Sequence, residues 1–106
     1  MYNCDCKGNT PEEEHEVFRE ALRRFGNLNQ AVVLLEEMSE LQKELCKDIR
    51  GQTHYAAIAE EIADVEIMLE QMKLLFDNRS LVQIFRNMKV NRLRQRLKEL
   101  SKNENR

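Results

Sequence analysis

Two stretches of the 106-residue chain decide its fold: LLEEMSELQKEL at residues 34–45 and IAEEIADVEIML at residues 58–69. In both, apolar residues recur every three or four positions, which is the spacing of one face of an α-helix. The first apolar stripe contains Leu34, Met38, Leu41 and Leu45, and the second contains Ile58, Ile62, Val65, Leu69 and Phe76. Because amphipathic helices bury such stripes against neighbours, the two stretches predict a pair of packed helices.

Start and stop signals outside these stretches predict four helices in all. Thr10-Pro11-Glu12-Glu13 has the pattern of a capping box, so a first helix is expected from there to about Phe25, where Gly26 permits a stop. The second helix is predicted to run from Asn27 or Asn29 to Arg50. The third is predicted to have its cap at Thr53 and its end at Asp77 or Asn78. The fourth is predicted to have its cap at Ser80 and its end near Leu100.

The composition agrees with a helical chain. One proline and three glycines occur among 106 residues, whereas Glu, Leu, Lys and Arg are plentiful. Four helices joined by short links predict an all-α fold, an antiparallel four-helix bundle. We expect a single helical domain over residues 10–100, with a flexible N-terminus at residues 1–9 and a frayed C-terminal tail at residues 101–106.

The predicted last helix has two apolar stripes instead of one. Leu81, Ile84, Phe85 and Met88 share one face, and Val90, Leu93, Leu97 and Leu100 lie on nearly the opposite face. A single groove cannot cover both stripes of a straight helix, so either the helix breaks near residues 87–91 or its second half packs on another subunit. We expect the second outcome, because so short a chain gains stability by association.

The second and third predicted helices also repeat an acidic pattern. Residues 36–41 read EEMSEL and residues 60–65 read EEIADV, so both have the order acid, acid, apolar, small, acid, apolar. In a helix of about 100° per residue, Glu37, Glu40, Glu61 and Asp64 lie beside the apolar stripes, where neighbouring helices face each other. Glu36 and Glu60 point away from the stripes.

Two interpretations of these acids are possible. Glu-x-x-Glu on a helix is commonly a solvated face with local ion pairs. Two copies in the same helical phase instead predict that four carboxylates converge, which would raise their pKa values and destabilise the fold unless a cation is bound. Oxygen ligands suit hard ions, so Mg²⁺ is the expected cofactor and Mn²⁺ an acceptable substitute.

The acidic segments resemble the Glu-x-x-Glu, spacer, Glu-x-x-Asp signature of the MazG-like, all-α nucleoside triphosphate pyrophosphohydrolases. The resemblance covers about residues 20–97 and includes the length of the spacer between the motifs. It implies a MazG-like fold and Mg²⁺-dependent cleavage of a nucleoside triphosphate to the monophosphate and pyrophosphate. It also implies that Glu37, Glu40, Glu61 and Asp64 are the metal ligands.

Other residues are assigned roles through the same resemblance. Gln30 is similar to a glutamine that often precedes the first acidic motif, and Lys89 and Arg92 resemble a Lys-x-x-Arg that meets the phosphates; the alternative for this pair is a basic surface stripe. Glu37 or Glu40 would position or deprotonate the attacking water. Narrower relatives that act on dUTP, dCTP or phosphoribosyl-ATP are the nearest alternatives.

An alternative from another class is a non-catalytic helical adaptor whose basic last helix contacts nucleic acid or protein. From Arg86 onward there are eight basic residues and two acidic ones. Aromatic residues for base stacking are absent from the basic cluster of Arg92, Arg94, Arg96 and Lys98, so no nucleic-acid partner is expected. We expect a homodimer or homotetramer.

The remaining features give only broad expectations. The three cysteines and the short apolar runs suggest a reduced, cytoplasmic setting without a membrane anchor. A metal site at the Cys4-Asp5-Cys6 pair is disfavoured, because the chain has no second cluster with zinc-like spacing.

Overall fold

The computed structural model describes residues 6–104, and all regular structure among these residues is α-helical. Its four helices are α1 (Pro11–Phe25), α2 (Asn27–Ile49), α3 (Tyr55–Phe76) and α4 (Arg79–Glu104). The predicted all-α class and the number of helices are therefore confirmed. Cys4 and Asp5 lie outside the described residues.

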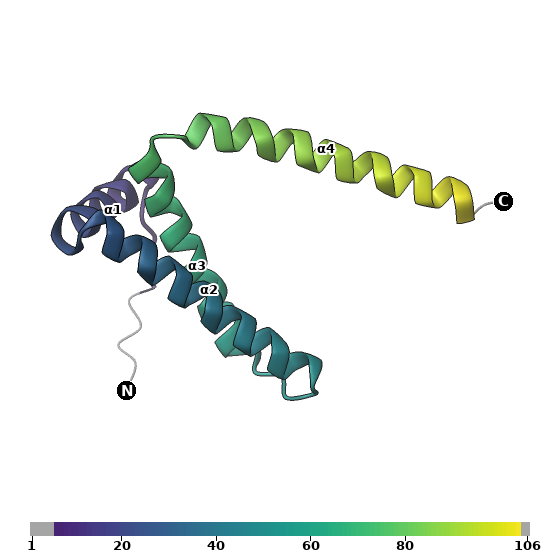
Figure 1. Ribbon diagram of the computed structural model, residues 1–106, viewed down its shortest axis with the longest axis horizontal. Helices are drawn as coiled ribbons and strands as arrows, with labels where there is room; N and C mark the ends of the chain where they lie inside the picture. Colours follow the sequence, from purple (N-terminus) through teal and green to yellow (C-terminus); the bar gives the residue numbers. More distant parts are fainter. Residues whose placement is uncertain (1–5, 105–106) are drawn as a thin grey trace. The chain divides into compact units, whose positions relative to one another are not determined.

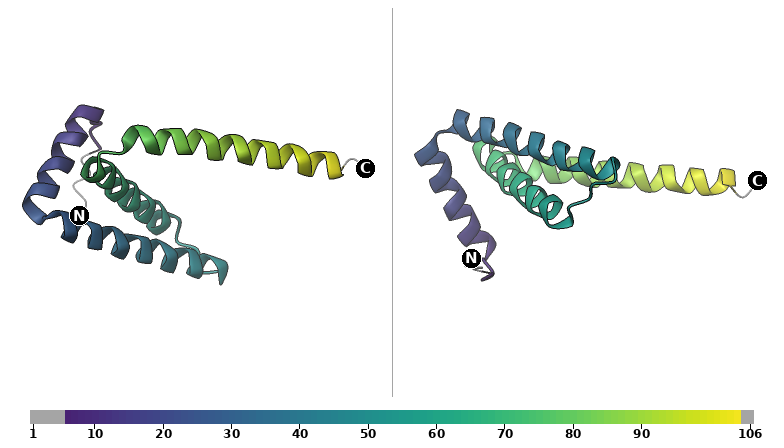
Figure 2. Two further views of the ribbon diagram at one scale, coloured as in Figure 1. Left: turned by 45° about the horizontal axis from the view of Figure 1, so that its top comes forward. Right: turned by 90° about the horizontal axis from the view of Figure 1, so that it is seen from below.

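The chain divides into two compact units, the first ending at Phe76 and the second beginning at Asp77. In the first unit, α2 and α3 lie side by side, joined by the short turn at residues 50–54 (Figures 1 and 2). Helix α1 contacts both of them. The second unit consists of α4, and a single domain over residues 10–100 stays a prediction.

The ends of α1 and α2 follow the local signals in the sequence. The Thr10 hydroxyl accepts a hydrogen bond from the Glu13 N–H at 3.1 Å, and the Glu13 carboxylate accepts one from the Thr10 N–H at 3.3 Å, which completes the predicted capping box. Gly26 (φ 90°) and Gly51 (φ 83°) follow α1 and α2. Both have a positive φ that glycine adopts without the steric penalty of a side chain.

Two of the predicted caps are wrong. Helix α3 begins at Tyr55, and the Thr53 hydroxyl donates to the Asp48 carboxylate instead of capping α3. Asp48 lies in the last turn of α2, so this bond ties the α2–α3 turn together. Helix α4 begins at Arg79, before the predicted Ser80 cap, and the Asn78 carbonyl accepts a hydrogen bond from the Val82 N–H.

The end of α4 also differs from the expectation. The helix passes Leu100 and runs to Glu104, through four of the six residues that we expected to form a frayed tail. Ser101, Lys102 and Asn103 are polar but have no proline or glycine among them, so nothing in the sequence stops the helix there.

The apolar core of the first unit is small. Phe18 and Leu22 of α1 and Met68 of α3 are its buried hydrophobic residues, with 8%, 9% and 5% exposure. They lie in the part of the unit where α1 covers the α2–α3 pair. Helix α1 therefore supplies two of the three buried hydrophobic residues found among residues 6–104.

Along the rest of the α2–α3 pair, the predicted apolar stripes are only partly covered. Leu34 and Leu41 are half-buried, whereas Met38 and Leu45 remain 40% and 43% exposed. The acid Glu37, next to Met38 in sequence, is more covered than Met38. The covered face of α2 is thus rotated from the predicted stripe toward the acids.

Helix α4 is continuous and has no buried residue. Both of its apolar stripes are exposed, each side chain by about half. The predicted alternative of a break near residues 87–91 is therefore wrong, because the helix passes through these residues without interruption.

None of the helices in residues 6–104 has the length and apolar character needed to cross a lipid bilayer. Cys46, near the end of α2, is an exposed free thiol.

The small core makes a prediction about stability. We expect Phe18→Ala to lower the free energy of unfolding by about 3 kcal/mol, because it removes a buried aromatic side chain and leaves a cavity. Val17→Ala is the matched control: Val17 is 64% exposed, and its truncation should cost less than about 0.5 kcal/mol. Urea unfolding followed by circular dichroism, at one protein concentration, measures both. Equal losses in the two variants would contradict this assignment of the core.

Candidate metal site

Three of the four predicted acidic ligands meet between α2 and α3. Glu37 comes from the middle of α2, and Glu61 and Asp64 come from one face of α3, one turn apart. All three are half-buried. The antiparallel course of the two helices brings residues that are more than twenty positions apart in sequence to the same level.

The three carboxylates form a compact group, with one oxygen from each lying within 4.8 Å of the others. Two oxygens on opposite sides of an octahedral Mg²⁺ ion are about 4.2 Å apart, so small side-chain movements would let all three reach one ion. Glu61 Oε2 is buried and has no hydrogen-bond partner within residues 6–104. A buried anionic oxygen without a donor is what a cation ligand would leave in the absence of its ion.

The pKa values show the electrostatic cost of this arrangement. Partial burial raises the pKa of Glu37 above its usual range, and the charge of Asp64 and a hydrogen bond with its side chain raise it further. Partial burial and the charge of Asp64 also raise the pKa of Glu61. Like charges in a poorly hydrated place favour the protonated forms, and a bound cation would remove that preference.

Glu40 is the fourth predicted ligand, and the structure places it at the margin of the group. Its side chain is exposed and is not among the three that converge. Its charge nevertheless raises the pKa of both Glu37 and Glu61, so it lies within electrostatic reach of them. Glu36 and Glu60 are exposed, as their helical phase predicted.

A further carboxylate, Glu44, was missed by the sequence analysis. Its side chain is 14% exposed, and its charge contributes to the raised pKa of Glu61. Lys47 Nζ lies 3.2 Å from Glu44 Oε1, whereas Glu44 Oε2 is buried without a hydrogen-bond partner and lies 4.0 Å from His54 Nδ1. Glu44 follows Glu37 by seven residues and so lies on the same helical face, which is the signal that could have identified it.

Gln30 lies in a different part of the unit from the carboxylates. It is 6% exposed, and its Nε2 donates a hydrogen bond of 2.6 Å to Oε1 of Gln71, which is 4% exposed. Gln30 precedes Glu37 by seven residues, or about 10 Å along the helix axis. The bond links the start of α2 to the end of α3. Its role as a substrate ligand stays a prediction, and Gln71 was not singled out from the sequence.

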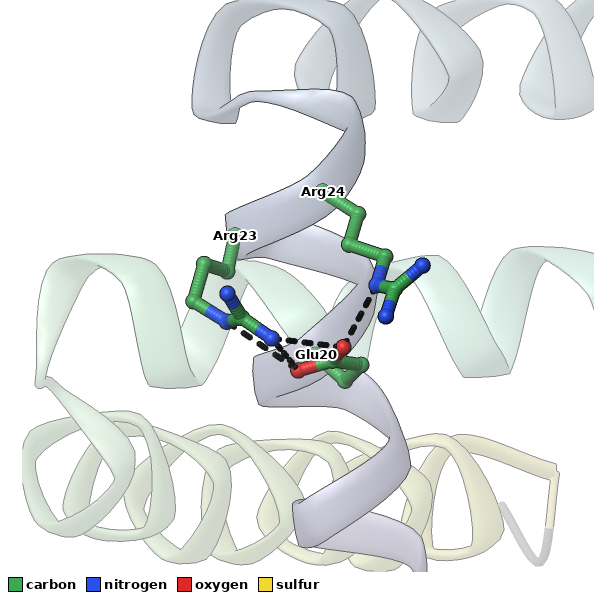
Figure 3. Close-up of polar contacts among 3 residues, drawn as sticks. All are labelled: Glu20, Arg23 and Arg24. Carbon is green, nitrogen blue, oxygen red and sulfur yellow. Dashed lines mark hydrogen bonds and ion pairs between the residues drawn. The ribbon is translucent and has the colours of Figure 1, made fainter.

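The predicted phosphate-binding residues, Lys89 and Arg92, are exposed on α4 and belong to the second unit. In the first unit, Glu20 of α1 accepts hydrogen bonds from Arg23 and Arg24, at distances down to 2.6 Å (Figure 3). The hydrogen bonds from these arginines lower the pKa of Glu20. Glu20 is thus neutralised by local ion pairs, in contrast to Glu37 and Glu61.

Comparison of the chain with family models, curated proteins and solved structures finds no match. The site is therefore interpreted from its own geometry, and its MazG-like character stays a resemblance of the acidic motifs.

The raised pKa values predict how stability depends on pH without metal. The folded chain retains protons on Glu37 and Glu61 that the unfolded chain loses, so this contribution to stability disappears as the pH rises through the folded-state pKa values. We expect the thermal midpoint to fall as the pH rises above about 4.3, the ordinary pKa of a glutamate, and Mg²⁺ to restore it once both carboxyls are ionised.

The matched control is Glu61→Gln. It removes one of the two carboxyls with a raised pKa, so the thermal midpoint should depend less steeply on pH. The Glu20 ion pairs act in the opposite direction, because a carboxyl with a lowered pKa stabilises the fold more at higher pH. These ion pairs are present in both the wild type and the variant, so they do not affect the comparison. An identical pH slope in wild type and variant would refute the assignment of repulsion to this site.

Proposed function

We propose that the chain is a Mg²⁺-dependent nucleoside triphosphate pyrophosphohydrolase with a MazG-like helical bundle. The observation that carries the proposal is the convergence of Glu37, Glu61 and Asp64 within 4.8 Å, with the Glu61 Oε2 atom lacking a hydrogen-bond partner among the described residues. The resemblance of the acidic motifs supplies the reaction class. Mn²⁺ would serve as an alternative ion.

The three converging carboxylates would hold the metal. Their geometry suits a hard cation, and they offer only oxygen ligands. When bound, the ion would neutralise charge on the triphosphate and lower the pKa of a coordinated water. The three carboxylates would fix the position of the ion, and they would repel the triphosphate if the ion were absent.

Glu40 is the carboxylate that we propose as the general base. It is exposed and outside the converging group, yet close enough to influence the pKa values of Glu37 and Glu61. A carboxylate that is not a metal ligand is available to accept a proton from the water while the oxygen of the water attacks phosphorus. The anhydride bond then breaks, and the products are the nucleoside monophosphate and pyrophosphate.

Cations for the phosphate chain would come from the basic last helix. Lys89 and Arg92 are exposed and would neutralise the leaving pyrophosphate. We further propose that the protein works as a homodimer or homotetramer, because only three hydrophobic residues of the described chain are buried while long apolar stripes remain exposed. A substrate screen that includes dUTP, dCTP and phosphoribosyl-ATP would distinguish a broad enzyme from a narrow one.

The metal ligands have a direct test in purified protein. We expect Asp64→Asn or Glu61→Gln to lower Mg²⁺-dependent pyrophosphate release at least about 100-fold, because each removes an anionic ligand. Glu36→Ala and Glu60→Ala, which change the exposed acids beside the site, should retain nearly full activity. Normal turnover in Asp64→Asn, or equal losses at Glu60 and Glu61, would rule out the assignment.

The proposed role of Glu40 predicts a separable effect. Glu40→Gln should lower kcat by about 100-fold while leaving the apparent affinity for Mg²⁺ within a few-fold of wild type, since it removes a base rather than a ligand. Steady-state kinetics at several Mg²⁺ concentrations distinguish the two effects. If the Mg²⁺ requirement rises and saturating metal restores kcat, Glu40 is a ligand and the base must be sought elsewhere.

A further inference from the structure

Helix α4 has more apolar surface than one chain can cover. Its stripes are formed by Leu81, Ile84, Phe85 and Met88 and by Val90, Leu93, Leu97 and Leu100, and each of these side chains is 49–56% exposed. The helix is continuous, so the stripes keep nearly opposite orientations along its length. One groove of the same chain could take one stripe at most, and the other stripe is left for a second molecule.

The stripe nearer the C-terminus has the spacing of a helix-packing seam. Val90, Leu93, Leu97 and Leu100, which we call the C-terminal seam, follow one another at intervals of three, four and three residues. These are the a and d positions of a heptad pattern. The flanking e and g positions hold Lys89, Arg94 and Arg96, all exposed. The seam therefore fits an apolar helical surface bordered by negative charge.

Pairing of two C-terminal seams with each other is disfavoured by these charges. In a parallel pair, Lys89 of one helix would face Arg94 of the other. In an antiparallel pair the g positions meet, which brings Lys89 toward Arg96. Both arrangements place like charges together, so the complementary surface must lie elsewhere.

The first unit presents such a surface on the α2–α3 pair. The Gln30–Gln71 hydrogen bond and the approach of Glu37 to Asp64 fix the antiparallel register, which places Met38 at the level of Ile62. Met38 and Leu45 of α2 and Ile62 and Leu69 of α3, which we call the hairpin face, are 40–44% exposed. By helical phase these residues lie on the side of the pair away from Glu37 and Glu61.

The hairpin face and the C-terminal seam also have opposite charges around them. Glu66 lies between Ile62 and Leu69 on the same face of α3 and is exposed. Residues 1–85 contain seventeen acidic and nine basic side chains, whereas residues 86–106 contain two acidic and eight basic ones. The hairpin face is thus an apolar surface on an acidic unit, and the C-terminal seam is an apolar surface on a basic helix.

We propose that the C-terminal seam of one copy packs on the hairpin face of a second copy, and that the exchange is reciprocal. The proposal builds on the self-association suggested above, and it does not depend on catalysis. It assigns the opposite stripe of α4, which begins at Leu81, no role in this contact.

Sedimentation velocity of the full chain tests the role of the seam. Wild type should sediment as a dimer at micromolar concentration, and Leu93→Glu/Leu97→Glu should raise the dimer Kd at least tenfold while circular dichroism still shows a helical chain. Gln95→Glu, an added charge on the far side of α4, is the matched control and should remain dimeric. Monomeric wild type would overturn both the self-association and this surface, whereas a dimer unaffected by the double substitution would overturn this surface alone.

A mixing experiment tests the hairpin face and the exchange. Arg94→Glu/Arg96→Glu and Glu66→Arg should each weaken the dimer, because each places like charges across both contacts. In an equimolar mixture, a mixed dimer has one native contact and one with reversed charges, so dimer formation should return. If dimer formation does not return on mixing, exchange between copies is refuted. If dimer formation returns only when all three substitutions are in one chain, α4 packs on the hairpin face of its own chain.

Discussion

The repulsion between carboxylates that face each other across α2 and α3 is the constraint on which the rest of the structure depends. Glu37, Glu61 and Asp64 occupy covered positions in the middle of the helix pair, where apolar residues would stabilise the fold more. The raised pKa values of Glu37 and Glu61 express this cost. We propose that this cost is offset by binding of a small, hard cation, for which carboxylate oxygens are suitable ligands.

The same constraint explains the thin core. With acids on the inner face of the pair, Met38 and Ile62 are turned toward the solvent side and stay partly exposed. Helix α1 compensates at one end through Phe18 and Leu22, and the Gln30–Gln71 hydrogen bond fixes the register there. Many apolar side chains of α2, α3 and α4 remain exposed, so the proposed metal site between α2 and α3 and the proposed association outside it would have a common origin.

Much of the fold could be predicted from local sequence, and the relation between helices could not. The capping box at Thr10 and the glycine after α1 are signals contained within a few residues, and the structure confirms them. Thr53 failed as a cap because its hydroxyl bonds to Asp48, which only the folded turn brings close, and Ser80 failed because α4 begins one residue before it. The end of α4 at Glu104 was missed because polar residues continue a helix as readily as they end one.

For the site, helical phase correctly brought Glu37, Glu61 and Asp64 together and turned Glu36 and Glu60 outward. It did not reveal that the covered face is rotated toward the acids, which places Glu44 inside and leaves Glu40 at the margin. The packing of α1 and the Gln30–Gln71 bond accompany that rotation, and both join residues far apart in sequence, so a local pattern could not predict them.

Binding of Mn²⁺ followed by electron paramagnetic resonance tests the central claim most directly, because the spectrum of the free ion disappears on coordination whether or not the right substrate is present. The account predicts stoichiometric loss of the free-ion signal with the wild-type chain, recovery of the signal on addition of excess Mg²⁺, and little loss with an Asp64→Asn chain that remains folded. A wild-type chain that leaves the Mn²⁺ signal unchanged at neutral pH would contradict it.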